Sequence, residues 1–314
     1  MTLYAKRYAA LAAAVLLLAP LSAKAQEGPV ATQALVAVDS KTNTVPDQQQ
    51  VTLKVNNRAT PLLGWKPVAA ANGAGVQVAL LIDDGLRESV GRQIDDLRTF
   101  IKNMPAGMQI YVGYMQNGHV VAAQDFTTDH ATAATKVRLP NGLPGMSSSP
   151  YFCLSDFVKR WPEGPQARFV MMITNGVDPY NGSDSILNQD SPNVKNAQEA
   201  AQGAGVAVYS IYYTDAGIAM RGEMASNSGQ SYLVQVAQTT GGVAYYEGDH
   251  NPVSMAPFLH DFQTAISETY VASFSAVANR GKLVPVKFST SADKTKLRAP
   301  DAVAPGNQEG APAQ

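Results

Sequence analysis

The chain has 314 residues, of which 45% are hydrophobic and 16% charged, and its formal net charge is −1. This length and apolar content allow one large domain with appendages and a sizeable core. A chain of this charge offers no electrostatic basis for binding nucleic acid, so we expect no nucleic-acid partner.

Residues 1–25 are typical of a secretory signal peptide. Lys6 and Arg7 precede an apolar run, and Ala23-Lys24-Ala25 forms a small-x-small cleavage site. A membrane anchor is the alternative, but the run is too short to span a bilayer and Pro20 interrupts it. We therefore expect a periplasmic or secreted protein with no membrane span after cleavage.

Residues 26–73 form a β-rich N-terminal segment. The stretches LVAV, VTLKV and PLLGWKPV have strand composition, and Asn56-Asn57 lies between the last two. Because Asn tolerates positive φ, this pair predicts a hairpin turn.

The central stretch of the chain is VQVALLIDDGLRES, from Val76 to Ser89. Its first seven residues predict a strand buried on both faces. Asp83 and Asp84 follow at once, then Gly85 and a helix of period 3.6. A strand, an acidic tip, a glycine turn and a helix are typical of an open α/β sheet, in which ligands bind beyond the carboxyl ends of the strands.

Further strands and helices alternate along the rest of residues 74–268. We expect parallel strands starting near Val76, Gln109, Arg168 and Val206, with the Val76 strand inside the sheet and helices on both faces. Asn117-Gly118 predicts a two-residue turn, so residues 119–124 return as an antiparallel edge strand. The fold class is therefore α/β: a doubly wound, mostly parallel sheet with one antiparallel edge strand.

Residues 269–298 are expected to form a C-terminal β hairpin that packs with the N-terminal segment into one small β unit. Neither flank is long enough to bury a core alone, and unprotected strand edges are a liability. Residues 299–314 are rich in Pro, Ala and Gly and predict a disordered tail.

Several stretches resemble the von Willebrand factor type A (vWA) superfamily over about residues 74–270, most closely its exported bacterial, VWFA-related branch, common in Acidobacteria. They are LIDDGLRES, DDLRTFIKNMPAGMQIYVGYM and AAQDFTTD, with VTLKVNNRATPLLGWKPV before the domain and TYVASFSAVANRGKLVPVKFS after it. The resemblance implies a Rossmann-like vWA domain that binds another protein.

The resemblance also implies a place for a metal-ion-dependent adhesion site. In the family, Asp-x-Ser-x-Ser after the first strand, a Thr from a middle loop and an Asp after the fourth strand hold Mg²⁺ with hard oxygen ligands. Asp83 matches the first Asp, but Gly85 and Arg87 stand at the two Ser positions. Asn175 stands where the last Asp belongs, and one of residues 147–149 would replace the Thr.

This altered ligand set indicates a degenerate site without a metal, and we expect no cofactor. If a metal were held, its ligands would be Asp83, Ser148 and Asn175, and Arg87 is expected to lie against Asp83 or Asp84 in place of the ion. The other interpretation of the two aspartates is a strand-end turn whose carboxylates are satisfied internally. The candidate partner-binding residues are Asp83, Asp84, Arg87, Ser147, Ser148, Asn175 and Asp178.

The resulting functional hypothesis is an exported protein-interaction or adhesion module whose partner is a protein at the envelope or outside the cell. The partner would meet residues 83–89, 140–150 and 175–191. The first alternative is a Mg²⁺-dependent adhesin, and the second is a hydrolase. We expect no enzyme, because no catalytic motif is present and the single cysteine, Cys153, reads as a buried structural thiol.

Overall fold

The computed structural model describes residues 28–307, except 43, 70–71, 163, 182–189, 215–222, 249 and 278–281, and of 223–226 it describes only the backbone. The expected signal peptide and residues 308–314 of the expected tail lie outside the described residues.

A six-stranded sheet forms the centre of the molecule, in the order β10-β9-β8-β5-β6-β7. All neighbouring pairs are parallel except β6 and β7. The prediction of a mostly parallel α/β sheet with β5 inside it is confirmed. The strands are β5 (Val76–Asp83), β6 (Gln109–Gln116), β7 (His119–Thr127), β8 (Ala167–Thr174), β9 (Val206–Tyr212) and β10 (Ala244–Tyr245).

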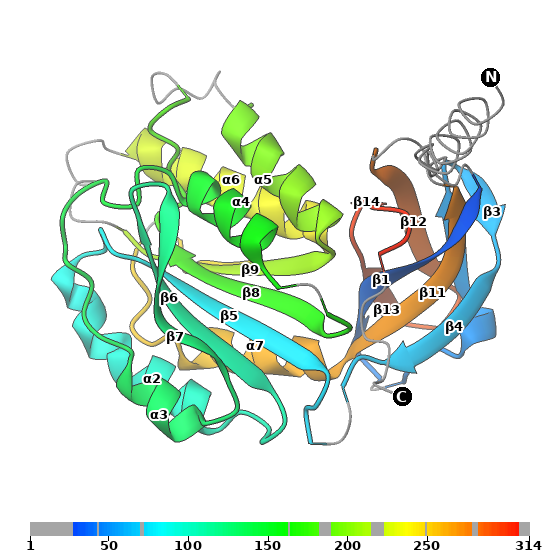
Figure 1. The fold of residues 1–314 in the computed structure, drawn as a ribbon, viewed down its shortest axis with the longest axis horizontal. Coiled ribbons are helices and arrows are strands. Elements are labelled where there is room, and N and C mark those ends of the chain that lie inside the picture. The colour runs from blue at the N-terminus through cyan, green and yellow to red at the C-terminus, as the bar shows by residue number, and fades with distance from the viewer. Residues whose placement is uncertain are drawn as a thin grey trace, which may run out of the picture.

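Helices cover both faces of this sheet (Figure 1). Alternate side chains of the buried strands point to opposite faces, so one apolar cluster joins the sheet to α2 and α7, and another joins it to α4, α5 and α6. The helices are η3 (Glu88–Gln93), α2 (Ile94–Lys102), α3 (His130–Thr135), α4 (Pro150–Arg160), α5 (Pro192–Gly203), α6 (Glu223–Thr240) and α7 (Ala256–Ser267).

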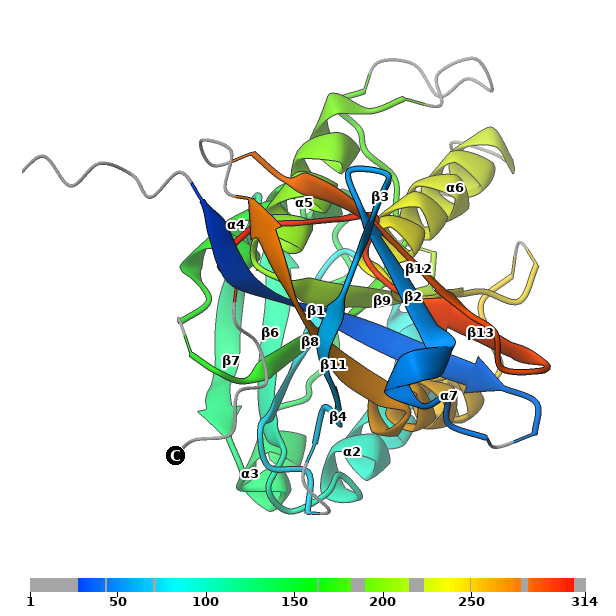
Figure 2. The same cartoon turned by 90° about the vertical axis from the view of Figure 1, so that its right-hand side faces the viewer.

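The two flanks of the chain meet in a β unit beside the α/β domain (Figures 1 and 2). It consists of two sheets, β13-β1-β11-β4 and β14-β12-β2-β3, packed around residues such as Leu53, Phe274 and Val286. Its elements are β1 (Pro29–Ser40), η2 (Gln48–Gln50), β2 (Val51–Val55), β3 (Arg58–Thr60), β4 (Leu62–Pro67), β11 (Thr269–Val277), β12 (Val284–Thr290), β13 (Thr295–Arg298) and β14 (Ala302–Val303).

Two predictions about this unit are wrong. β11 and β12 do not form a hairpin, because β11 pairs with β1 and β4 while β12 pairs with β2 and β14 in the other sheet. Residues 299–307 are not a disordered tail. β14 pairs with β12, the amide of Asp301 donates to the Thr239 carbonyl, and the Asn307 carbonyl accepts from Gln33 N. Backbone pairing, which composition does not report, holds this segment in place.

Both predicted asparagine turns are confirmed. Asn56 and Asn57 have φ of 50° and 60° and join β2 to β3, and Asn117 and Gly118 have φ of 48° and 79° and join β6 to β7. The second turn places the start of β7 next to the loop that follows α3, at the carboxyl edge of β5, which brings the candidate residues together.

Candidate functional site

Asp83 is the last residue of β5, and its carboxylate is buried. One oxygen, Oδ1, accepts a hydrogen bond from Gly85 N at 3.0 Å. The other, Oδ2, accepts from Ser147 Oγ at 3.1 Å and from Thr174 Oγ1 at 2.8 Å. Three donors to this carboxylate are therefore neutral groups: two hydroxyls and one amide.

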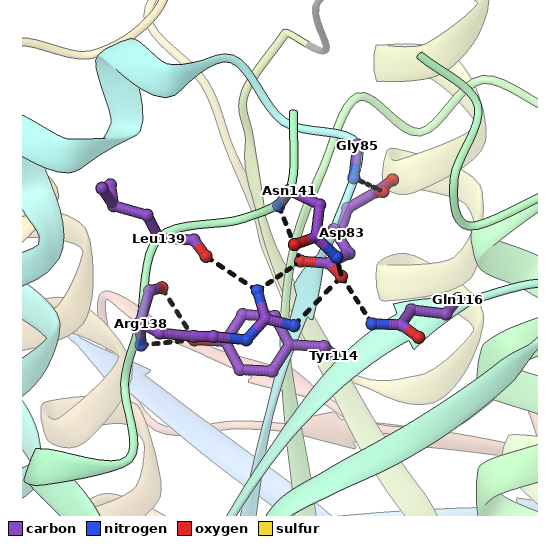
Figure 3. Close-up of polar contacts among 8 residues, drawn as sticks. Asp83, Gly85, Tyr114, Gln116, Arg138, Leu139 and Asn141 are labelled. Carbon is purple, nitrogen blue, oxygen red and sulfur yellow. Dashed lines mark hydrogen bonds and ion pairs between the residues drawn. The ribbon is translucent and has the colours of Figure 1, made fainter. Parts of the chain in front are cut away.

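Asp84 follows directly and has entirely different partners (Figure 3). It is 0% exposed, and Arg138 donates to both of its oxygens, from Nη1 at 2.7 Å and Nη2 at 3.0 Å. Asn141 donates from its backbone N at 3.0 Å and from Nδ2 at 2.5 Å, and Gln116 Nε2 donates at 2.5 Å. Buried charge is stable only when it is paired and hydrogen-bonded in this way.

Tyr114 on β6 holds Arg138 in place. The guanidinium carbon lies 3.8 Å from the centre of the Tyr114 ring, a cation–π contact. The Tyr114 hydroxyl donates to Arg138 O at 2.8 Å and accepts from Arg138 N at 2.6 Å. Burial raises the pKa of Tyr114, and the hydrogen bonds with Asp84 raise the pKa of Arg138, so the phenol stays protonated and the arginine charged near neutral pH.

Residues 139–149, which we call the cover loop, lie over this pair of aspartates. Gly142 N donates to Asp84 O at 3.1 Å, and the β6–β7 turn donates from Asn117 N to Met146 O at 2.8 Å and from Gly118 N to Ser147 O at 2.9 Å. The loop leaves Leu139 53% exposed and Leu143 57% exposed. Two apolar side chains thus stand in solvent on a loop fixed from below by a buried carboxylate.

The residues present do not fit a Mg²⁺ ion at Asp83. A Cβ on Gly85 would lie 2.8 Å from the Leu143 carbonyl oxygen and 3.2 Å from Met146 N, so the cover loop occupies the space of the first missing serine. Asp84, the other carboxylate, is engaged by Arg138. Among the described residues, no group of three or more His, Cys, Asp or Glu side chains could hold a metal ion. One carboxylate and two hydroxyls fall short of the charge and six-oxygen geometry that Mg²⁺ requires.

The structure places the other predicted residues differently from the expectation. The β8 side chain on Asp83 is Thr174, whereas Asn175 uses its Oδ1 to accept from Val177 N at 2.8 Å. Asp178 is buried and accepts from Ser191 Oγ at 2.6 Å and Asn193 Nδ2 at 2.9 Å, so it fixes the start of α5 rather than facing a partner.

The three serines of the cover loop differ from one another. Ser147 is the one that reaches Asp83, while Ser148 has a φ of 63°. Ser149 stands at the N-cap of α4, but its side chain makes no capping bond, and among the described residues its buried Oγ has no hydrogen-bond partner.

Sequence reasoning missed Arg138, Asn141, Gln116 and Thr174. The cation on Asp84 is Arg138, 54 residues along the chain, whereas Arg87 was expected to lie against Asp83 or Asp84. The backbone N of Arg87 donates to Thr214 O at 3.4 Å. Asp84 itself was expected at the partner surface, and this prediction is wrong because Asp84 is fully buried. The sequence does indicate that a second carboxylate at the end of a buried strand needs a cation. It does not identify which cation, because residue spacing says nothing about an arginine 54 residues away.

Cys153 on α4 is buried, as predicted, and burial raises the pKa of its thiol. Its Sγ donates to Ser147 O at 3.4 Å. A thiol with a raised pKa is a poor nucleophile near neutral pH, so Cys153 belongs to the packing beneath the cover loop.

No family model and no curated protein matches the chain. Among solved structures, a von Willebrand factor type A protein from Catenulispora acidiphila is similar with 9% identity and a TM-score of 0.42, over 90% of this chain and 75% of that one. An aerotolerance-related membrane protein from Bacteroides fragilis NCTC 9343 has 10% identity and a TM-score of 0.43, over 61% of this chain and 98% of that one.

The pilus adhesin SpaC from Lactobacillus rhamnosus GG is also similar, with 8% identity and a TM-score of 0.45, over 80% of this chain and 46% of that one. With TM-scores below 0.5 these likenesses carry no inference about function. Within the part of the chain that the structure describes, no helix is long and apolar enough to cross a membrane.

Proposed function

We propose that this chain is an exported protein-interaction module of the vWA type that binds its partner at the carboxyl edge of the central sheet without a metal ion. The observation that carries the proposal is the pair Leu139 and Leu143, 53% and 57% exposed, on a loop held by the buried Asp84. An apolar side chain displayed on a pre-organised loop costs little conformational entropy when it is buried by a partner.

The proposal places the partner, a protein of the envelope or the exterior, against the cover loop and the neighbouring η3. Gly91 of η3 lies close beneath Leu139, since a Cβ there would be 2.9 Å from Leu139 Cδ2. Val253, 89% exposed, borders the same helix, because Gln93 Nε2 donates to Val253 O at 3.1 Å. These three apolar side chains on neighbouring segments support a contact surface there.

Two rival functions remain testable. A Mg²⁺-dependent adhesin is disfavoured by the cover loop over Gly85 and by the Arg138 guanidinium on Asp84. A hydrolase is disfavoured because Ser147, Ser149 and Cys153 are all buried, out of reach of a substrate. We propose that the chain is not an enzyme, and a broad hydrolase substrate screen checks this.

The proposed surface is tested by immobilising the full chain and measuring which envelope proteins it retains, with Leu143→Asp as the test variant. Burying a leucine is worth about 1.5–3 kcal/mol, so the charge should weaken binding by about tenfold or more. Leu63→Asp is the matched control, because Leu63 on β4 is 66% exposed but lies in the β unit. If both variants retain the partner as well as the unmodified chain does, the proposed surface is wrong. If both lose the partner to the same extent, binding does not depend specifically on the cover loop, and the proposed surface is again wrong.

A further inference from the structure

The closed cover loop contains two local costs. Ser148 has a φ of 63°, in the left-handed region that side chains other than Gly, Asn and Asp rarely occupy. Directly after it, Ser149 is 0% exposed, and its Oγ has no hydrogen-bond partner in the part of the chain that the structure describes. Both features disfavour the observed conformation, and such features persist only when surrounding contacts impose them.

Two sets of contacts impose the conformation. At the Ser148 end, Asn117 N and Gly118 N of the β6–β7 turn donate to Met146 O and Ser147 O, and at the other end the contacts converge on Asp84. Arg138 and Asn141 both bind the Asp84 carboxylate, and Gly142 N binds the Asp84 carbonyl. Asp84 is fully buried, so a loop that leaves it must let water in to replace these donors. The loss of one hydrogen bond to Asp84 then destabilises the others, so we expect them to break together.

From this balance we propose that the cover loop is a latched lid, closed by the Asp84–Arg138 pair and able to open while the sheet stays folded. Opening would break the Ser147–Asp83 bond, uncover the oxygens of Asp83 and Thr174, and displace Leu139 and Leu143. The inference rests on the proposed function, because those two leucines are the proposed contact residues, and the lid then regulates the partner surface.

Residue-resolved amide hydrogen exchange on the full chain, at several low urea concentrations, tests the lid without any partner. The informative amides are Gly142, which bonds to Asp84, and Asn117 and Gly118, which bond to the cover loop. They should exchange faster than amides inside β8 and show little dependence on urea, because they open locally. Amides inside β8 should accelerate with urea, because they exchange through global unfolding.

Variants then address the latch itself. Arg138→Met should accelerate exchange at Gly142, Asn117 and Gly118 by about tenfold or more, since a hydrogen-bonded charge pair is lost. Arg160→Met is the matched control, because Arg160 is also ion-paired with an aspartate, Asp156, but on the surface, and it should leave these rates unchanged. Ser148→Gly should slow them by about threefold, because Gly adopts positive φ without penalty.

If Arg138→Met fails to fold, Asn141→Ala removes one side-chain donor only and should accelerate exchange at Gly118 by about threefold. The lid is wrong if the loop amides exchange only together with β8 and with the same urea dependence. It is also wrong if loss of the Arg138 charge, or of the Asn141 amide where that variant is the one that folds, leaves their rates unchanged. Neither result bears on the Leu143→Asp binding experiment, so the two proposals fail separately.

Discussion

The β unit and the carboxyl edge of the central sheet both expose a leucine, yet they are held in different ways. Leu63 stands on β4, a strand fixed by backbone pairing with β11 and by an apolar core that includes Phe274. Leu143 stands on a loop held by polar contacts: at one end with the buried Asp84 and Arg138, and at the other with the β6–β7 turn.

The two kinds of contact differ in how easily each region can change its conformation. In the β unit the stabilising contacts are apolar and spread over many residues, so no single contact controls the structure. At the carboxyl edge they are few and polar, and those at the start of the cover loop converge on Asp84. The β unit is therefore expected to stay fixed, and the carboxyl edge is where we propose the partner surface and the lid.

The largest predicted effect tests the scaffold side of this comparison. Phe274 is buried between the two sheets of the β unit, so Phe274→Ala should lower the free energy of unfolding by about 4 kcal/mol. Val277→Ala on the same strand, where the side chain is exposed, should change it by less than about 0.5 kcal/mol. Urea denaturation followed by circular dichroism measures both, and similar values for the two would show that the β unit has no essential core.

The second prediction tests whether the cover loop is seated on Gly85. A Cβ there would meet the Leu143 carbonyl at 2.8 Å, so Gly85→Ala should cost about 1–3 kcal/mol by overpacking. Gly28→Ala is the control, because nothing lies within 4 Å of a Cβ at that position. A neutral Gly85→Ala would mean that the loop lies farther from β5. The same contact predicts that placing serines at positions 85 and 87 and aspartate at 175 fails to create Mg²⁺ binding.

Asp129, an exposed carboxylate, should contribute less to the stability of the fold than the buried Asp84 does. Asp129 caps α3 by accepting from Thr132 N at 2.9 Å, and this bonding with Thr132 lowers its pKa below the usual 3.8. A lowered pKa stabilises the fold above the unfolded value and loses that contribution as pH falls through the folded value. Asp129→Asn should therefore lower the melting temperature slightly at pH 7 and leave it unchanged well below pH 3.8. A difference that persists in acid would contradict the capping role.

The smallest predicted effect is that of Mg²⁺. An ion that the native state does not bind cannot stabilise it, so millimolar Mg²⁺ should leave the melting temperature unchanged. Scanning calorimetry with and without the ion measures this, with Ca²⁺ as a control for general salt effects. A shift specific to Mg²⁺ would favour the adhesin alternative and contradict the proposal that the site at Asp83 holds no metal ion.

The sequence predicted the sheet well, because buried parallel strands such as Val76–Asp83 and Ala167–Thr174 are nearly continuous apolar runs. It predicted the asparagine turns for a similarly local reason, the tolerance of Asn for positive φ. It failed on strand partners in the β unit, because β11 and β12 look like a hairpin and only the whole fold sends them to separate sheets.

At the candidate site the sequence predicted which sheet edge the residues share, but not which side chains bond to one another there. Asp83 and Ser147 do meet, as their places after β5 and before α4 suggested. The pairing of Asp84 with Arg138 depends on where a loop crosses the sheet edge, and no periodicity or spacing records that. Thr174, the last residue of β8, donates to Asp83, whereas the next residue, Asn175, accepts from Val177 N, and the sequence does not show which of the two side chains turns toward Asp83.

A double-mutant cycle between Asp84 and Arg138 tests the central claim most directly, with Asp156 and Arg160 as the matched surface pair. Unfolding free energies of Asp84→Asn, Arg138→Met and the double variant should give a coupling of about 1–2 kcal/mol, because Arg138 is partly exposed but donates twice to a fully buried carboxylate. The surface pair should give less than about 0.5 kcal/mol. Equal coupling in the two cycles would contradict the claim that the contact between buried Asp84 and Arg138 helps to hold the cover loop and its two leucines in place.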